Sequence, residues 1–144
     1  IPFESVMQID IRSVEPKRLD VMEAYLTTAV EEALAHQNKT KRHGPELTVS
    51  IDKIGNRPSG ELSDQLPLVQ RTLAATQAFG VQPFLTRGST NSNIPIAQGI
   101  PAVTIGRGGD GGKAHSLDEW WTNKEGHKAI QLALLILLME SGME

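Results

Sequence analysis

Residues 88–121 read GSTNSNIPIAQGIPAVTIGRGGDGGKAHSLDEWW, and this stretch decides how the rest of the chain is interpreted. Two short apolar segments, 81–85 and 102–105, are expected strands, and each runs into a loop of small polar residues. The first loop is GSTNSN, and the second is the glycine-rich run that leads to His115. Loops at strand ends bind ligands in open α/β sheets, because their backbone N–H groups and side chains are free of the ladder. The stretch therefore predicts one crevice lined by both loops.

Helices are expected around these strands. Ser63 can cap a helix whose apolar positions continue to Gly80, which has the place of a C-terminal glycine cap. A brief helical turn is expected over 94–98, and a closing helix over 123–141. Strands that alternate with helices indicate an α/β fold.

The chain before residue 55 predicts a strand, a helix and a second strand. Apolar and polar residues alternate over 6–12 and again over 47–51, which is the period of a strand with one buried face. Between them, apolar residues recur every three or four positions from Pro16 to about His36, the spacing of a helix. The expected buried set of the first strand is Met7, Ile9 and Ile11. GNRPSG at 55–60 is the best linker candidate, and we place the domain boundary there.

Composition excludes several functional classes. With 14 basic and 17 acidic residues the net charge is -3, which is not the basic footprint of a nucleic-acid or anionic-membrane binder. There is no cysteine, so a metal must rest on His, Asp or Glu. The longest apolar run, 129–139, is far shorter than the roughly 20 residues of a membrane helix. We expect a cytoplasmic protein, and the start at Ile1 and Pro2, without a leader, predicts a fragment for which secretion stays open.

The glycine run has a superficial likeness to nucleotide-binding motifs. Gly106, Gly108 and Gly111 satisfy GxGxxG after an expected strand, but the third glycine does not open a helix as the dinucleotide motif requires. The phosphate loop also fails, since Lys113 is followed by Ala114 rather than Ser or Thr. A glycine turn without a ligand competes with nucleotide binding, which stays a weaker hypothesis.

His115 is the imidazole best placed to bind a metal. Neutral imidazole is the commonest protein metal ligand, and Asp118 and Glu119 follow closely enough to orient or charge it. A surface or hydrogen-bonded role competes, because one ligand cannot hold a metal that needs three or four.

Hydroxyls and arginines supply further candidates. Ser89 and Thr90 lack the GxSxG elbow of a serine nucleophile, and hydroxyls after a glycine suit donation to a substrate carbonyl or carboxylate. Arg12 and Arg57 can each make bidentate contacts with a carboxylate. A solvated or salt-bridged arginine is the competing interpretation for both.

Taken together, residues 88–121 resemble the closing segment of the dinuclear zinc metallopeptidases. This family includes tripeptidases, acetylornithine deacetylase, succinyl-diaminopimelate desuccinylase, aminoacylases and glutamate carboxypeptidases. The small-residue loop, the GIPAVTIG strand, the glycine turn and the AHSLDEW box stand in the family's order. VMQIDIRS at 6–13 resembles the strand of the family's lid domain that ends in arginine, so the likeness covers nearly the whole chain.

The resemblance implies a fragment of a two-domain zinc exopeptidase. Residues 1–55 would be the last part of a ferredoxin-like lid that often dimerises, and residues 56–144 the C-terminal part of the α/β catalytic domain. The family's other zinc ligands, its bridging aspartate and its glutamate general base all precede the lid. The resemblance therefore places them outside this chain, which is expected to contain no catalytic residue and to be inactive alone.

The resemblance also assigns roles to single residues. His115 would be the last zinc ligand, Arg12 the lid arginine that binds the substrate's carboxylate, and Arg57 is a looser match. The loop facing the substrate would be Gly88, Ser89, Thr90 and Asn91. The family commonly has aspartate where Asn91 stands, so a charge is lost while hydrogen bonding is kept. Two zinc ions are implied, with at most one ligand in this chain.

The implied activity is hydrolysis of an amide bond in a small peptide or N-acyl amino acid. In such a mechanism two zinc ions lower the pKa of a bridging water, a glutamate moves the proton, and the lid closes. A homodimer through the lid is implied, with neither nucleic acid nor membrane as a partner. The alternative is a non-catalytic oligomerisation or interaction module, because an open strand edge is a ready pairing surface.

Overall fold

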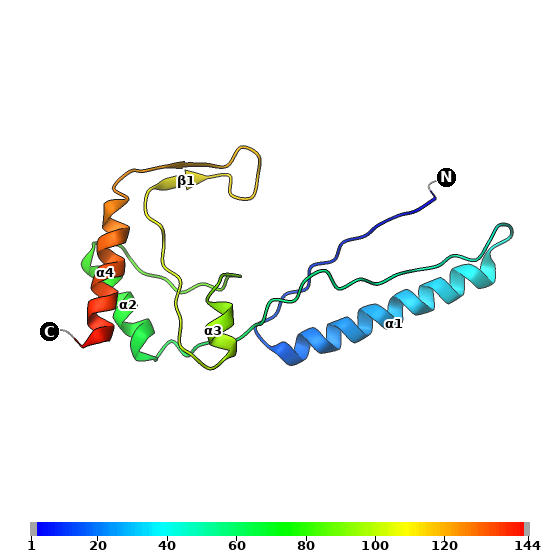
Figure 1. Cartoon of the computed structure of the whole chain (residues 1–144), viewed down its shortest axis with the longest axis horizontal. Helices are drawn as coiled ribbons and strands as arrows, with labels where there is room; N and C mark the ends of the chain where they lie inside the picture. Colours follow the sequence, from blue (N-terminus) through cyan, green and yellow to red (C-terminus); the bar gives the residue numbers. More distant parts are fainter. Residues whose placement is uncertain (1–2, 143–144) are drawn as a thin grey trace. The chain divides into compact units, whose positions relative to one another are not determined.

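The computed structural model describes residues 3–142, and the expected strand start at Ile1 and Pro2 lies outside this range. The chain divides into two compact units, Ile1–Glu61 and Leu62–Glu144. Figure 1 shows the order of the elements along the chain. Among residues 3–142, the first unit has one long helix, and the second has three helices and a two-stranded sheet.

The long helix of the first unit is α1 (Pro16–Thr40). It begins where proline suits the first helical position, because the missing N–H of proline would have no partner there. The helix passes its expected end near His36, since 37–40 contain no glycine or proline to break it. Its last turn is supported by the Thr40 hydroxyl, which donates to the His36 carbonyl at 2.9 Å.

The two strands that the alternating pattern predicted for the first unit are not formed, so both predictions are wrong. The described residues of this unit contain no strand, and 6–12 and 47–51 are extended without a ladder. Met7 is 74% exposed and Ile9 49% exposed, and Ile11 is half-buried, so they are not a buried set. A strand needs a partner for its backbone groups, and alternation alone does not provide one.

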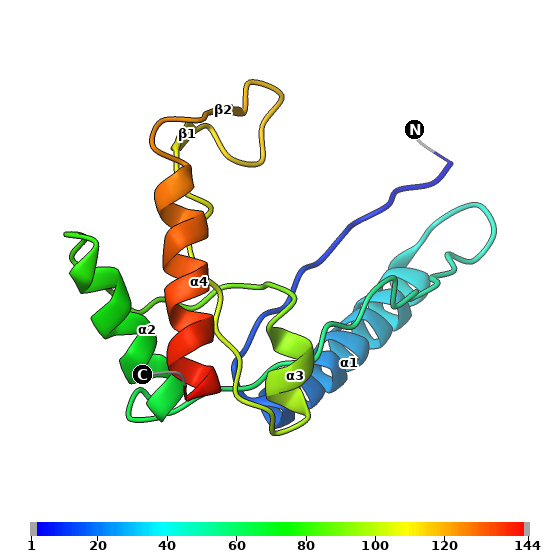
Figure 2. The ribbon, with the colours of Figure 1, turned by 60° about the vertical axis from the view of Figure 1, so that its left-hand side comes forward.

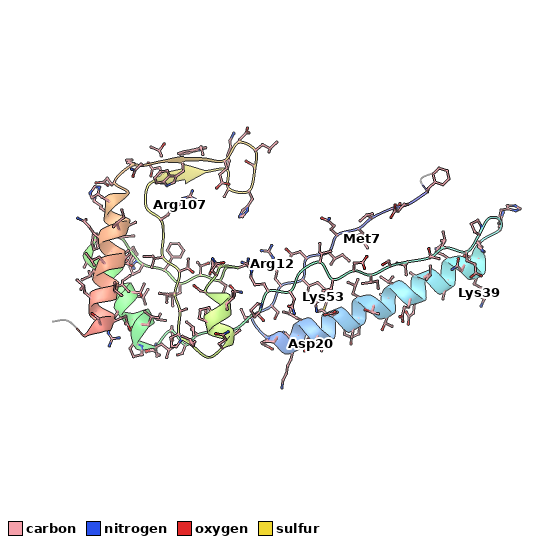
Figure 3. All side chains as sticks on the ribbon, in the orientation of Figure 1. Met7, Arg12, Asp20, Lys39, Lys53 and Arg107 are labelled. Atoms are coloured by element: carbon pink, nitrogen blue, oxygen red, sulfur yellow. The ribbon has the colours of Figure 1, made fainter. Side chains whose placement is uncertain are left out.

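Two polar contacts hold the second extended segment to α1. The Asn38 side chain accepts from the Leu47 N–H at 2.8 Å and donates to the Leu47 carbonyl at 3.0 Å. Lys53 Nζ lies 2.6 Å from Glu23 Oε2, nearer the other end of the helix (Figure 3). The segment therefore runs back along α1, and one helix side chain, that of Asn38, bonds its backbone at Leu47.

The second unit is built on two helices that pack together, α2 (Pro67–Ala78) and α4 (His127–Ser141), as Figure 2 shows. Arg71 Nη1 and Glu140 Oε1 join them at 2.7 Å. The buried apolar side chains of the described residues are Val69, Ala75 and Ile136. The core is therefore a narrow seam between the two helices.

The N-termini of α2 and α4 differ from those predicted from the sequence. Ser63 does not cap α2, because its hydroxyl accepts from the Gln65 N–H at 3.2 Å in a turn that precedes Pro67. The closing helix starts at His127 rather than at residue 123, since Glu125 is in the left-handed region with φ 54. A short helix, α3 (Asn93–Ala97), forms close to the expected helical turn.

The strands of the second unit lie where the sequence pattern did not place them. Segments 81–85 and 102–105 are extended without a ladder, so these two predicted strands are wrong in the described chain. Instead β1 (Asp110–Gly112) and β2 (Trp120–Thr122) pair antiparallel, with Gly111 opposite Trp121 and Gly112 opposite Trp120. We call residues 106–122 the glycine hairpin.

A large surface remains accessible. The chain exposes 12176 Å², whereas two separate compact units that share its mass of 15.7 kDa equally would expose about 8,800 Å² in all. Large apolar side chains are among the exposed residues, including Val6, Phe84 and Leu117. Within residues 3–142, no helix has the combined length and hydropathy that crossing a bilayer demands.

Candidate functional site

The GSTNSN loop is held by a cluster of hydroxyls. Thr104 Oγ1 lies 2.9 Å from Thr90 Oγ1 and 2.7 Å from Ser92 Oγ, and we call these three residues the hydroxyl cluster. The loop backbone is fixed as well, because Thr90 N–H donates to Asn93 Oδ1 at 2.9 Å and Ser92 N–H to Thr90 Oγ1 at 3.2 Å. The first loop therefore contacts the segment that leads into the glycine run.

The hydroxyl cluster suits binding of a polar group. Three hydroxyls carry three donor hydrogens, and two mutual hydrogen bonds use two of them. One hydrogen remains to donate to a carbonyl or carboxylate oxygen, and the remaining lone pairs can accept from an N–H or O–H group, beside the exposed Asn91. Gly88 and Ser89 are also exposed, on the approach to the cluster.

Two members of the cluster, Ser92 and Thr104, were missed by reasoning from the sequence. Thr104 stands between Val103 and Ile105, and consecutive residues of an extended segment point to opposite sides. A lone threonine in an apolar run was the available signal. It gave no indication of the loop that the hydroxyl would contact.

His115 lies in a tight loop that joins β1 to β2. Residues 113–119 form this segment, which we call the His115 loop, and both Lys113 (φ 54) and His115 (φ 64) are in the left-handed region. Ser116 Oγ donates to the Lys113 carbonyl at 2.7 Å, and Lys113 Nζ lies 3.2 Å from Asp118 Oδ2. These contacts keep the loop closed and leave His115 exposed.

The expected carboxylate partners do not touch the imidazole. Glu119 Oε2 accepts instead from the backbone N–H of His115, at 3.3 Å, and Asp118 is paired with Lys113. A backbone N–H thus takes one of the two carboxylates, and the ammonium group of Lys113 takes the other. The ring nitrogens of His115 have no hydrogen bond within residues 3–142.

His115 can supply one ligand to a zinc ion. An exposed neutral imidazole can coordinate zinc through either nitrogen, but a stable site needs three or four donors. Within residues 3–142 no three His, Asp or Glu side chains are grouped to hold a metal. Metal binding at His115 therefore requires ligands from elsewhere.

Close packing explains three glycines of the hairpin, Gly108, Gly109 and Gly112. A Cβ on Gly109 (φ +74) would lie 2.6 Å from Trp121 Nε1, and one on Gly112 would lie 2.8 Å from Trp120 Nε1. A Cβ on Gly108 (φ +71) would lie 2.9 Å from the Cβ of Ala129 on α4. Indoles and a helix occupy the space that side chains would need. Of the three glycines of the GxGxxG spacing, Gly108 is explained by its contact with α4, and a Cβ on Gly111 would lie 3.1 Å from Trp120 O, whereas no atom lies within 4 Å of the Cβ position of Gly106.

Arg12 is engaged by its neighbour Asp10. Its Nε lies 3.1 Å from both carboxylate oxygens and its Nη2 lies 2.7 Å from Oδ2. The hydrogen bond with Arg12 lowers the pKa of Asp10, and the same bond raises the pKa of Arg12. The Arg12 side chain is 77% exposed, so a ligand carboxylate can compete with Asp10 for it.

Replacing Asp10 with asparagine is expected to strengthen carboxylate binding at Arg12, because a competing anion is removed. An exposed ion pair is weak, so the gain is up to about fivefold in dissociation constant. Titration of the chain with N-acetyl-L-alanine, followed by NMR at residue 12, measures it. Because the pKa of Asp10 is lowered, protonation releases Arg12 only at strongly acidic pH.

The matched control for this prediction is Glu15→Gln. It removes the similarly exposed pair between Glu15 and Arg18, whose atoms lie 2.7 Å apart. Equal tightening in the two variants would show a general change of charge, and no tightening in Asp10→Asn would remove Arg12 as a carboxylate site.

Arg57 and Arg12 belong to the first unit, whereas His115 and the hydroxyl cluster belong to the second. Arg57 lies in the extended segment that follows α1. Among the segments that the sequence predicted to form the site, the structure brings the GSTNSN loop into contact with 102–105. No family model matches this chain, and no curated protein matches it.

Proposed function

We propose that this chain is the C-terminal part of a two-domain, zinc-dependent amidohydrolase that cleaves an amide bond in a small peptide or N-acyl amino acid. Support comes from the motif order in residues 88–121 and from one observation in particular. An exposed imidazole sits on a closed loop, with its carboxylate neighbours turned to other partners. His115 is thereby open to a ligand.

Different residues of the chain bind the zinc and the different parts of the substrate. His115 holds zinc together with ligands that the rest of the protein supplies. Zinc, when bound, lowers the pKa of a coordinated water and polarises the scissile carbonyl. The hydroxyl cluster and Asn91 hydrogen-bond the polar groups of the substrate, and Gly88 and Ser89 border it. Arg12 exchanges Asp10 for the carboxylate of the substrate.

The catalytic base and the remaining zinc ligands are proposed to lie in a part of the protein that precedes this chain. The chain alone is then inactive, and the whole protein holds two zinc ions. We place that protein in the cytoplasm. The test is His115→Ala in the whole protein, with zinc content and amide hydrolysis measured together.

A second candidate function is a non-catalytic oligomerisation module, and the first unit favours it. Its extended segments carry alternating apolar residues that are exposed, among them Met7, Val49 and Ile51. Over the two units together, the exposed area exceeds that of two compact units by about 3,400 Å², several times the roughly 800 Å² that each partner buries in a standard interface. A homodimer through this unit is compatible with either function.

Sedimentation velocity of the chain is expected to show a dimer whose fraction rises with protein concentration. Introducing lysine at Val49, an exposed position of the alternating segment, is expected to weaken it at least tenfold, because a charge would be buried in the interface. Lysine at Leu134 on α4, which is similarly exposed, serves as the control. A monomer at every concentration would reject oligomerisation through the first unit.

A further inference from the structure

We propose that Trp121 is a positioning residue that sets the orientation of the His115 loop. The proposal rests on the proposed function only in treating His115 as a zinc ligand. Trp121 is not among the residues that we propose to hold zinc or substrate. It acts through the backbone of the glycine hairpin.

Trp121 joins the two sides of the hairpin at its base. Its Nε1–H donates to the Gly108 carbonyl at 2.9 Å, and its ring covers Gly109 so closely that a Cβ there would lie 2.7 Å from Cε2. Gly108 in turn lies against α4, since its Cβ position is 2.9 Å from Ala129 Cβ and 3.3 Å from Gly126 Cα. One indole therefore links β2, the approach to β1 and the start of α4.

The His115 loop has no other polar anchor among the described residues. Its hydrogen bonds and ion pairs connect members of the loop to one another, as with Lys113 and Asp118 or His115 and Glu119. The loop is thus closed on itself, and its direction follows from β1 and β2. Each of these strands has three residues, and so short a ladder is marginal without support. Trp121 supplies that support.

Trp120 is a natural control for Trp121. The two are adjacent and similarly exposed, at 48% and 46%. Trp120 also packs on a glycine, since a Cβ on Gly112 would lie 2.8 Å from its Nε1. Within residues 3–142 its indole N–H has no hydrogen bond, and consecutive strand residues face opposite sides. The two tryptophans therefore differ in the tie to Gly108.

The experiment compares Trp121→Phe with Trp120→Phe in the 144-residue chain without metal. Phenylalanine keeps an aromatic ring and removes the N–H donor. Amide exchange and nitrogen-15 relaxation are measured at 113–119 and, separately, in α2 and α4. Loss of one net hydrogen bond predicts about threefold to tenfold faster loop exchange in Trp121→Phe, with α2 and α4 unchanged. Trp120→Phe is expected to change the loop less than twofold.

Three results would overturn the proposal. They are an unchanged loop in Trp121→Phe, an equal change in Trp120→Phe, and a loosening of α2 and α4 together with the loop. The last result would mark Trp121 as a general stabiliser of the unit.

A second readout connects the loop to zinc. In the whole protein, Trp121→Phe is expected to weaken zinc binding by about the factor seen in loop exchange, while Trp120→Phe retains the original affinity. Zinc affinity that is unchanged by His115→Ala would reject the proposed function. Amide exchange measured without metal would still decide whether Trp121 positions the loop. The two failures are therefore distinguishable.

Discussion

Replacing His115 with alanine is expected to remove zinc and amide hydrolysis together from the protein that carries this chain. Loss of a direct zinc ligand leaves a site short of donors, and it should cost more than the 10- to 100-fold in affinity typical of losing a residue that only supports a ligand. We therefore expect a loss of more than about 100-fold in zinc affinity, with turnover falling in proportion. Zinc content by elemental analysis and hydrolysis of an N-acetyl amino acid measure the two effects.

Two controls separate ligand loss from loop damage. His127→Ala removes an exposed imidazole at the first residue of α4 and should change neither quantity. His115→Asn should abolish zinc binding while keeping the loop, because asparagine tolerates the left-handed region that His115 occupies at φ 64. Unchanged zinc and turnover in His115→Ala would end the hydrolase proposal.

Replacing Gly109 with alanine is expected to destabilise the second unit by about 2 to 5 kcal/mol. The left-handed conformation at φ +74 penalises any Cβ by about 1 to 2 kcal/mol. The new methyl would also meet Thr122 O at 2.5 Å and Trp121 Nε1 at 2.6 Å, and overpacking of this kind costs about 1 to 3 kcal/mol. Urea unfolding followed by circular dichroism gives the free energy of unfolding.

Gly99→Ala is the matched control, since the two glycines share a backbone conformation but not their surroundings. Gly99 has φ +77, and no atom lies within 4 Å of its Cβ position. It should show the conformational penalty alone, about 1 to 2 kcal/mol. Equal losses in the two variants would mean that the indole does not occupy the space above Gly109.

The helices could largely be predicted from the sequence. Pro16 marks the start of α1, and three- and four-residue apolar spacing follows it, so the signal is local. The end of α1 was placed short because polar residues alone do not stop a helix, and α1 continues to Thr40. The start of α4 was placed early because nothing in the spacing shows that Glu125 takes a left-handed conformation.

The strands were harder to predict because strand formation depends on partners distant in the chain. Alternation over 6–12 describes a segment that can pair, but the described chain offers it no ladder. The hairpin in 110–122 was missed for the opposite reason. Glycine has low strand propensity, and what allows Gly111 and Gly112 to pair is room for Trp121 and Trp120.

At the candidate site, the sequence indicated which residues belong to the loops but not which residues they contact. The GSTNSN loop was identified from its composition, and its contact with Thr104 needed coordinates. The expected pairing of the His115 ring with Asp118 or Glu119 was wrong, because spacing does not distinguish an imidazole from the backbone N–H of the same residue. The role of His115 as a zinc ligand stays a prediction.

The chain contains two tryptophans, Trp120 and Trp121, and both stand on β2. Its intrinsic tryptophan fluorescence therefore comes from a single hairpin, a few residues from the candidate metal ligand. Any shift or quenching of that emission when an ion or small molecule is added reports a local event there. The native sequence thus already carries an optical probe beside the imidazole, with no label to attach.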